Sequence, residues 1–502
     1  MTDYDIVILG GGSAGIVSGV MAGSLGMRVL LVEKFKLGGE CLNSGCVPSK
    51  ALLHAAKVAQ IMRTADCVGL PSHNISRSDS DGVFSKVREA INEVRSADAT
   101  EKLLVDSGVT IKFGNAALVD EHTLNLNGER IKFGNAIVAT GSRPAIPIIP
   151  GLGNDYLTNV NIFDLNEIPK RFLVVGGGPV GVEMAQAFAR LGSRVTLVQR
   201  SATLLPRDDV EVSRALTGYL VDEGIDIRLG CTIRDVRTED KTRIASVITN
   251  GARSDIPFDQ VLLATGRMPN VEGLSLERIG VNCSESGVVV DNRLRTTVPN
   301  IYACGDVTGK YQYSHMAEYE AKLVVGNIVF PKPSRADFTT HPSATFTDPE
   351  VVHIGMTEQE ATGSGLKFDV LRQPFSQNDR AITEHDTRGF IKVLTQGLQG
   401  KILGVHIIGP RAGELAQEWI LAMQLGKSIR TVADLIHVYP TLSLVNQHVA
   451  QRWYESKSKE PLFASLIRGY ARIIRPNGVA IRNGALLLTA GAILAAIGRK
   501  RH

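Results

Sequence analysis

The chain has 502 residues, of which 44% are hydrophobic, and a formal net charge of +4 at pH 7. This length exceeds what one hydrophobic core supports and indicates about three domains. Six cysteines in such a length exclude a dense framework of structural disulfides. We expect no signal or transit peptide ahead of the first strand and no nucleic-acid partner.

The first segment predicts a nucleotide-binding βαβ unit. A short apolar strand, three spaced glycines, a small-residue helix and a second strand ending in an acid follow one another: Asp5–Gly10, Gly10, Gly12, Gly15, Arg28–Val32 and Glu33. Glycines let a pyrophosphate approach the backbone at a helix N-terminus, and the acid can accept hydrogen bonds from ribose hydroxyls. The alternative is a glycine-rich turn without a ligand, which the combination of strand, helix and acid disfavours.

Two cysteines, Cys41 and Cys46, follow with four residues between them, ahead of an apolar helical run. The spacing predicts that both sulfurs lie in the first turn of a helix, where the backbone N–H groups favour a thiolate. Such a pair can cycle through a disulfide. The alternatives are two buried free thiols or half of a zinc site, and zinc would need a second ligand pair, whereas the other cysteines stand alone.

The run GGECLNSGCVPSK, residues 38–50, resembles the redox motif of the class I FAD-dependent pyridine nucleotide-disulfide oxidoreductases. That family includes glutathione reductase, dihydrolipoyl dehydrogenase and mercuric reductase. The resemblance implies a bound FAD with Cys46 against the flavin as the charge-transfer thiol. It also implies that Cys41 is the interchange thiol that meets the substrate and that Lys50 lies near flavin N5.

Further along the chain, a polar loop over Pro71–Asp81 precedes one long surface helix over Val83–Leu104, which has apolar positions at helical spacing. Strands are expected at Val109–Phe113 and Leu124–Leu126. The segment from residue 137 to residue 144 contains Ala-Thr-Gly, which the family carries where its cofactor domains cross. By resemblance, Thr140 and Gly141 contact the cofactor.

A second βαβ unit begins at Phe172 and repeats the glycine pattern with Gly176, Gly178 and Gly181. Two dinucleotide folds with a cysteine pair between them suggest that electrons pass from a nicotinamide to a flavin and then to a disulfide. By resemblance, Glu183 pairs with Lys50 beside the flavin. The alternative for Glu183 is a plain glutamate on a helix surface.

The second unit has no counterpart of Glu33, because its second strand ends at Gln199 and Arg200. A neutral residue followed by a guanidinium accepts a 2′-phosphate, which an acid would repel. This favours NADPH over NADH as the electron donor. NADH stays open, because Arg200 can also be a solvated side chain.

A second Ala-Thr-Gly run places Gly266 at another crossing. The Cys-Gly-Asp segment that ends at Asp306 resembles the family's second flavin contact. In the family, this aspartate accepts hydrogen bonds from the ribityl chain. A helix beginning at Ser314 packs against the flavin in the family. We therefore expect a discontinuous FAD-binding domain, residues 1–155 and 275–335. We expect an NAD(P)-binding domain over residues 156–274.

Residues 336–455 are expected to form an α+β domain. The resemblance implies that this is the family's dimerisation domain, whose last segment reaches the partner's active site. The family ends this domain with a histidine base and a glutamate, but Tyr439 and Leu444 occupy these positions here. A phenol with an ordinary pKa near 10 is a poor base at pH 7. His437 can substitute only if the backbone shifts, so efficient turnover of dihydrolipoamide or glutathione disulfide is in doubt.

The tyrosine resembles mercuric reductase, yet no cysteine follows Cys304 to hand over Hg(II), and we expect no resident metal site. Residues 456–502 form a tail in which residues 461–502 carry seven basic side chains and no acidic one. A basic amphipathic stretch followed by an apolar one predicts a cytoplasmic protein attached to the inner face of a membrane. The alternative is a helix packed on the protein body or at a subunit contact.

The sequence as a whole predicts an α/β protein with two Rossmann-like dinucleotide-binding domains and a C-terminal α+β dimerisation domain. It predicts a homodimeric, mercuric-reductase-like FAD enzyme that uses NADP(H), with NAD(H) as the alternative, and the Cys41–Cys46 disulfide. Its acceptor is a small molecule or a metal ion. The alternatives are a dihydrolipoyl dehydrogenase-type disulfide reductase and a membrane-tethered redox-sensing flavoprotein with little turnover.

Overall fold

The structure is a computed structural model that describes residues 2–80, 82–249, 251–459 and 465. The predicted membrane-attached tail lies almost entirely outside these residues. The chain forms two compact units, Met1–Phe338 and Thr339–His502. Among the residues that the structure describes, no helix is long and apolar enough to cross a bilayer.

The first unit contains a mixed sheet with strand order β3-β2-β1-β6-β5-β4, and β18 pairs with β6. The strands are β1 Tyr4–Leu9, β2 Val29–Glu33, β3 Val109–Phe113, β4 Ala116–Asp120, β5 Thr123–Leu126, β6 Glu129–Val138 and β18 Ile301–Ala303. Pairing is parallel from β3 to β6 and β18, and antiparallel through β5 and β4. Strand β18 therefore joins a late segment of the chain to the first βαβ unit.

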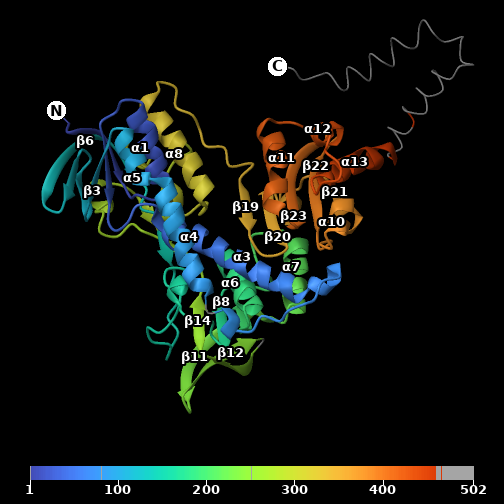
Figure 1. Ribbon diagram of the computed structural model, residues 1–502. Coiled ribbons are helices and arrows are strands. Elements are labelled where there is room, and N and C mark those ends of the chain that lie inside the picture. The colour runs from blue at the N-terminus through green and yellow to red at the C-terminus, as the bar shows by residue number, and fades with distance from the viewer. Residues whose placement is uncertain (1, 81, 250, 460–464, 466–502) are drawn as a thin grey trace, which may run out of the picture. The chain divides into compact units, whose positions relative to one another are not determined.

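Helices α1 (Ser13–Ser24) and α8 (Ser314–Val329) pack side by side in this unit (Figure 1). Their small buried residues, including Ala14, Ala22 and Ala321, join one apolar cluster with the inner faces of β1 and β2. This close contact places the N-terminus of α8 near the cysteine motif that follows β2.

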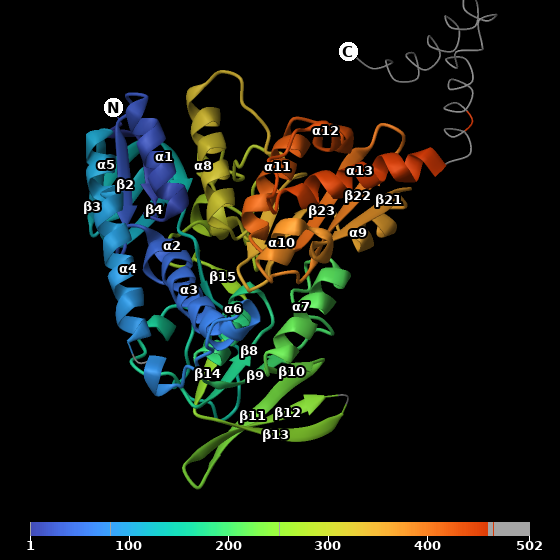
Figure 2. The ribbon, with the colours of Figure 1, turned by 45° about the vertical axis from the view of Figure 1, so that its right-hand side comes forward.

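The same unit holds a fully parallel sheet with order β10-β9-β8-β14, which is the second dinucleotide fold. Its elements are β8 Arg171–Val175, α6 Pro179–Arg190, β9 Arg194–Gln199, α7 Val210–Asp222, β10 Asp226–Leu229 and β14 Gln260–Leu263. Figure 2 shows α6 beside α3 (Cys46–Arg63), the helix that carries one of the redox cysteines.

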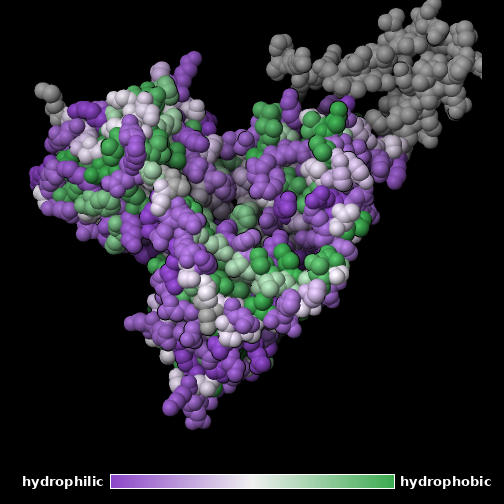
Figure 3. Space-filling model, viewed as in Figure 1, coloured by the Kyte–Doolittle hydropathy of each residue, from purple (hydrophilic) through white to green (hydrophobic). Residues whose placement is uncertain are grey.

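An antiparallel sheet, β11 (Cys231–Glu239), β12 (Thr242–Thr249) and β13 (Ala252–Phe258), extends from this fold. Its outer surface is largely hydrophilic in Figure 3. Short strands β7 (Ser142–Pro144) and β15 (Arg267–Pro269) pair where the two Ala-Thr-Gly segments cross.

The predicted single helix over Val83–Leu104 is wrong. The structure has α4 (Val83–Asp98) and α5 (Thr100–Asp106), separated by Ala99 in the left-handed region with φ 38°. The apolar positions pack against two different elements: the Phe84 ring on α4 contacts the Phe188 ring of α6 at a tilted angle, whereas Leu104 on α5 packs into the cluster beside α1. A straight helix could not reach both.

The second unit is α+β, with sheet order β19-β20-β23-β22-β21. Its elements are β19 Pro342–Thr345, β20 Glu350–Gly355, α9 Glu358–Gly363, β21 Asp369–Pro374, α10 Asp379–Thr383, β22 Phe390–Gln396, β23 Lys401–Gly409, α11 Ala412–Gln424, α12 Ile429–Asp434 and α13 Leu444–Lys459. One face of the sheet forms the core with α11 and α13 around Trp419. The predicted fold class is confirmed by these two dinucleotide folds and the α+β unit.

Candidate active site

In the first glycine loop, Gly12 faces open space that a ligand could occupy, whereas Gly10 and Gly15 are packed against backbone atoms. A Cβ on Gly10 would lie 2.3 Å from the carbonyl oxygen of Ala139, and one on Gly15 would lie 1.8 Å from the carbonyl oxygen of Gly10. At Gly12 the nearest atom would be 3.8 Å away. The turn is therefore tight, with open space in front of the α1 N-terminus, which suits a pyrophosphate.

Glu33 ends β2 and braces this loop. Its Oε2 accepts a hydrogen bond from the Gly11 backbone N–H at 2.7 Å, and its Oε1 accepts one from the Phe35 N–H at 2.7 Å. Each carboxylate oxygen keeps a second lone pair that can accept a ribose hydroxyl. The loop, the helix end and this acid together fit the adenosine diphosphate half of FAD.

The second loop copies this arrangement with a neutral side chain. A Cβ on Gly176 would lie 2.2 Å from the Ala264 oxygen, one on Gly181 would lie 1.8 Å from the Gly176 oxygen, and one on Gly178 would meet nothing within 4 Å. Gln199 ends β9, and its Oε1 accepts a hydrogen bond from the Gly177 N–H at 3.1 Å. Gln199 thus braces the loop as Glu33 does, without the negative charge.

The two redox cysteines lie on different helices, which corrects the prediction that one helical turn holds both. Cys41 is in α2 (Gly39–Asn43), and Cys46 is the first residue of α3. Gly45 interrupts the helix, and a Cβ there would lie 2.9 Å from the Glu40 carbonyl oxygen. Pro48 fits the first turn of α3, where its missing N–H costs no helical hydrogen bond. The positive end of α3 therefore acts on Cys46.

The surroundings of the pair divide it into a thiolate and a thiol. The pKa of Cys46 is lowered to about 6, chiefly because the Cys41 thiol donates a hydrogen bond to its sulfur, with further help from Ser314 and the charge of Lys50. The same hydrogen bond, followed by burial, raises the pKa of Cys41 well above its ordinary value. At neutral pH, Cys46 is the anion and Cys41 keeps its proton.

Ser314, the first residue of α8, was not predicted as a site residue. Its Oγ lies 3.6 Å from the Cys46 sulfur, although the two residues are 268 positions apart in the chain. Its hydroxyl can donate to the thiolate, which stabilises the charged form.

We expect Ser314→Ala to raise the pKa of Cys46 by roughly half a unit to one unit, because one hydrogen bond to a charged group is lost. The pH dependence of the iodoacetamide alkylation rate of the reduced protein measures this pKa. Ser49→Ala is the matched control, because the Ser49 hydroxyl donates to the Cys46 carbonyl oxygen and not to its sulfur. An unchanged alkylation midpoint in Ser314→Ala would contradict the assignment.

Lys50 and Glu183 meet one turn beyond the thiolate. The Lys50 Nζ lies 2.9 Å from Glu183 Oε2, and the Glu183 side chain is 6% exposed. This contact joins α3 to α6 and therefore joins the cysteine helix to the second dinucleotide fold. The predicted pairing of Lys50 with Glu183 is present in the structure, and both residues lie beside Cys46.

The crossing segments form a second polar network. The Thr140 hydroxyl donates to the Asn270 carbonyl oxygen at 2.7 Å, while Gly141 and Gly266 adopt positive φ angles with open space around them. Asp306 accepts a hydrogen bond from the Ser142 hydroxyl at 2.6 Å. Its carboxylate can still accept hydrogen bonds, which fits a ribityl chain.

Arg267 connects this network to the cysteine motif. Its Nε donates to the Ser142 hydroxyl at 2.7 Å and lies 3.4 Å from an oxygen of Asp306, while its other nitrogen forms an ion pair with Glu40. Neither Arg267 nor Glu40 was predicted as a site residue. Glu40 directly precedes Cys41, so the arginine holds the cysteine helix against the crossing.

Glu320 lies on α8, behind Asp306, and is buried. Its Oε2 accepts a hydrogen bond from the Gly305 N–H at 2.7 Å, and its Oε1 has no hydrogen-bond partner among the described residues. Burial, followed by the charge of Asp306, raises the pKa of Glu320 to about 7. The neutral carboxylic acid is therefore the form that the fold prefers.

This preference predicts how stability changes with pH. The folded pKa is about 7 and the ordinary value is 4.5, so the stabilisation is complete below pH 4.5 and is lost as the pH rises to 7. The loss amounts to about 3 kcal/mol. Glu320→Gln is expected to remove this part of the pH dependence and to be more stable than the wild type at pH 8.

Urea unfolding of the FAD-loaded protein at pH 5 and pH 8 measures the effect. Glu318→Gln is the control on the same helix, because Glu318 is only half-buried. If Glu320→Gln shows the same drop in midpoint as the wild type, the carboxyl is already charged in the fold.

Arg200 directly follows Gln199 at the end of β9 and is exposed. The last two predicted residues, Tyr439 and His437, lie in the second unit. Tyr439 is 69% exposed, and its hydroxyl donates to Asp379 Oδ2 at 2.9 Å. This hydrogen bond raises the pKa of the phenol, so Tyr439 is a proton donor and not a base. The side chain of His437 is 7% exposed, with Nε2 3.1 Å from Glu418 and Nδ1 3.2 Å from the Leu435 carbonyl oxygen. Both nitrogens of His437 are thus engaged within the unit.

Two models of protein families match the chain. Residues 4–321 match the pyridine nucleotide-disulphide oxidoreductase family, and residues 341–449 match its dimerisation domain. The chain belongs to the pyridine nucleotide-disulphide oxidoreductases. The resemblance stated from the cysteine motif is thereby confirmed, and this oxidoreductase is an FAD-dependent enzyme of a homodimeric family.

Curated relatives of the oxidoreductase carry different names. It is 34% identical to the mercuric reductase of Staphylococcus aureus over 449 residues, which covers 88% of this chain and 81% of that protein. It is 33% identical to the dihydrolipoyl dehydrogenase of Geobacillus stearothermophilus over 456 residues, covering 89% and 96%. The family and the names of these relatives confirm the prediction that the enzyme transfers electrons from a pyridine nucleotide through FAD and a disulfide to an acceptor.

Solved structures agree with this family. The HOCl-induced flavoprotein disulfide reductase RclA from Escherichia coli superposes with a TM-score of 0.79 at 27% identity, covering 89% of this chain and 99% of that chain. Its Cu(II) complex superposes equally well, with a TM-score of 0.79 at 26% identity and coverages of 90% and 100%. In the oxidoreductase, no group of three or more His, Cys, Asp or Glu side chains that could hold a metal ion occurs among the described residues.

Proposed function

We propose that the enzyme passes electrons from NADPH through the Cys41–Cys46 pair to a thiophilic metal ion. The observation that carries this proposal is the thiolate of Cys46, hydrogen-bonded by the thiol of Cys41 and flanked by Lys50 and Ser314. Thiolates bind soft metal ions strongly. A metal acceptor also needs no histidine to transfer a proton. This matters because Tyr439 occupies the position where the family has its histidine.

The residues that would hold FAD are the first glycine loop with Glu33, the crossing at Thr140 and Gly141, and Asp306. When bound, FAD accepts the reducing equivalents of the nicotinamide and delivers them to the disulfide. The second glycine loop with Gln199 and Arg200 would hold the nucleotide. Because the brace of this loop is neutral, a 2′-phosphate meets a guanidinium without a competing carboxylate, which supports NADP(H).

The reduced cysteine pair supplies two electrons, which two Cu(II) ions accept. The Cys46 thiolate and the Cys41 thiol form one S–S bond, two Cu(II) ions become two Cu(I) ions, and the proton of Cys41 is released. The ion pair between Lys50 and Glu183 holds a positive charge beside the thiolate before this step. Cys41 keeps its proton until the S–S bond forms, because its pKa is raised.

Tyr439 has a separate role in this proposal. In the homodimer, the segment that carries it would approach the partner's dithiol, where its phenol donates a hydrogen bond to the acceptor or to the acceptor's ligands. Asp379 accepts a hydrogen bond from the phenol in the free unit and keeps the side chain oriented.

Steady-state NADPH oxidation against Cu(II), Hg(II), lipoamide, glutathione disulfide and a soluble quinone tests the acceptor. We expect kcat/KM for Cu(II) to exceed that for lipoamide by at least about 100-fold, since the disulfides need the base whose position Tyr439 occupies. A variant lacking both cysteines corrects for direct reduction of the metal. Equal or better turnover of lipoamide would overturn the proposal in favour of a dihydrolipoyl dehydrogenase-type enzyme.

We also propose that the tail attaches the enzyme to an anionic membrane surface. Its support is the sequence of residues 461–502, with seven basic side chains and no acidic one beside long apolar runs. Co-sedimentation of the full chain with phosphatidylglycerol vesicles tests it. Binding should fall when Arg468, Arg472 and Arg475 are replaced by glutamine, and binding that does not differ between anionic and neutral vesicles would overturn it.

A further inference from the structure

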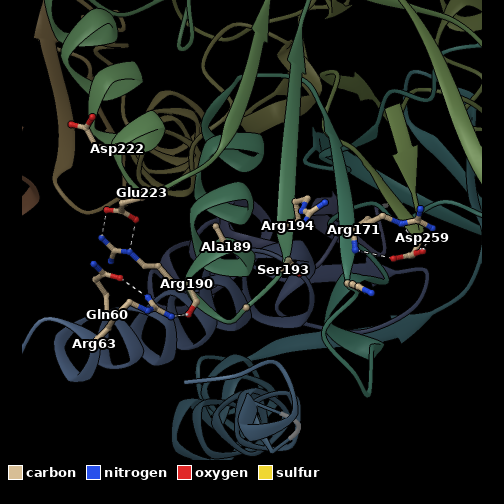
Figure 4. Close-up of a pocket in the computed structure, with 12 residues that line it drawn as sticks. Gln60, Arg63, Arg171, Ala189, Arg190, Ser193, Arg194, Asp222, Glu223 and Asp259 are labelled. Carbon is tan, nitrogen blue, oxygen red and sulfur yellow. Dashed lines mark hydrogen bonds and ion pairs between the residues drawn. The ribbon is translucent and has the colours of Figure 1, made fainter. Parts of the chain in front are cut away.

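A cavity of about 1140 Å³ lies in the first unit, away from the cysteine pair. Figure 4 shows Gln60, Arg63, Arg190 and Glu223 on one side and residues from the ends of β8 and β9 on the other. Arg63 ends α3, whereas Cys46 begins it, so Arg63 lies about 25 Å along the helix from Cys46.

The cavity is also distinct from the nucleotide loop of the second fold. Arg171 and Arg194 are the first residues of β8 and β9, and both line the cavity. The glycine loop and Gln199 lie at the opposite, carboxyl ends of these parallel strands. Dinucleotides bind at the carboxyl ends, so this cavity has no part in holding NADP(H).

The charged residues of the lining are five basic and three acidic. Two of the bases are paired. Arg190 forms a bidentate contact with both oxygens of Glu223, at 2.8 and 2.6 Å, and Arg171 donates from Nε and Nη2 to one oxygen of Asp259, at 3.1 and 2.5 Å. The remaining acid, Asp222, lies beyond Glu223 on the α7 side of the cavity (Figure 4).

Three cations therefore lack a carboxylate partner within the described part of the chain. Arg63 donates to neutral oxygens, Gln60 Oε1 at 2.6 Å and the Arg190 carbonyl at 2.9 Å. Lys170 and Arg194 are exposed, and among the described residues neither side chain forms a hydrogen bond or an ion pair, although the charge of Lys170 acts on Asp259 at longer range. With five basic and three acidic residues the lining has a net charge of +2. A cavity of this charge attracts anions, and a guanidinium matches the oxygen geometry of a phosphoryl group.

We propose that this cavity binds a small anion with two or more phosphoryl groups. The volume accommodates a ligand of this size. No aromatic side chain lines the cavity, so it offers no stacking surface for a nucleobase. The ligand is thus an inorganic polyphosphate or a multiply phosphorylated metabolite, which share the chemistry that the cations recognise.

Calorimetric titration of the full-length, FAD-loaded protein with tripolyphosphate tests the proposal, with saturating NADP+ and NAD+ present to fill the nucleotide site. A sugar bisphosphate titrated in the same way separates the organic source from the inorganic one. We expect one site per chain, and Lys170→Gln with Arg194→Gln should weaken binding at least ten-fold without changing the KM for NADPH.

Lys332→Gln with Arg335→Gln is the matched control, because it removes the same two charges from exposed positions of the same unit. This control should bind tripolyphosphate as the wild type does. Equal weakening in both double variants, or complete loss of binding in sulfate at the same ionic strength, would show nonspecific charge attraction and overturn the proposal.

Discussion

Cys41→Ser is expected to lower kcat with the acceptor by about 10³-fold or more, because the disulfide can no longer form and the attacking or ligating thiol is absent. The Cys46 thiolate and the Lys50–Glu183 ion pair remain. The variant should therefore still consume about one equivalent of NADPH per bound FAD in an anaerobic titration. Steady-state NADPH oxidation measures the loss of turnover, and single-turnover NADPH oxidation measures the reaction with NADPH that the variant keeps.

Cys67→Ser is the control for this experiment, because Cys67 is an exposed free cysteine outside the pair. It should keep the wild-type kcat. Full activity of Cys41→Ser with every acceptor would mean that electrons leave the flavin directly, and the role of the dithiol would have to be abandoned.

Gln199→Glu should reverse the nucleotide preference and change the ratio of kcat/KM for NADPH to that for NADH by about 100-fold. The new carboxylate can still accept the hydrogen bond that the Gly177 N–H gives to Gln199, as Glu33 accepts from Gly11, so the loop should keep its shape. Its charge repels a 2′-phosphate by about 2–3 kcal/mol at such a distance.

Arg200→Gln completes the comparison, because it removes the cation without adding a negative charge. It should raise the KM for NADPH and leave the KM for NADH unchanged. If Gln199→Glu leaves the ratio of the two nucleotides unaltered, the 2′-phosphate does not lie near this strand end.

Local patterns predicted much of the site. The glycine spacing, the strands beside it and the terminal residues Glu33 and Gln199 lie within short segments whose geometry follows from backbone sterics. The break at Gly45 could not be read from the spacing of the cysteines, because helical periodicity is compatible with one helix through both. The division at Ala99 was hidden for the same reason, since the apolar stripe continues while its packing partner changes.

The sequence also did not predict the contacts between distant segments of the chain. Ser314 reaches Cys46, and Arg267 reaches Glu40 and Ser142, only because α8 and the two crossings fold against the cysteine motif. Nothing in the sequence around either residue shows this. The one available signal was an acid, Glu40, inside the cysteine motif, which called for a basic partner elsewhere in the chain.

The segment at the end of α12 has a practical consequence for handling the enzyme. Ile436 is 100% exposed, Val438 is 75% exposed and Tyr439 is 69% exposed, so three large side chains project from a few successive residues. Because the strip lies in the family's dimerisation domain, we expect the second subunit to cover it. Dilution that separates subunits should make the protein adhere to vessel walls and precipitate, so assays at nanomolar concentration will need a carrier protein.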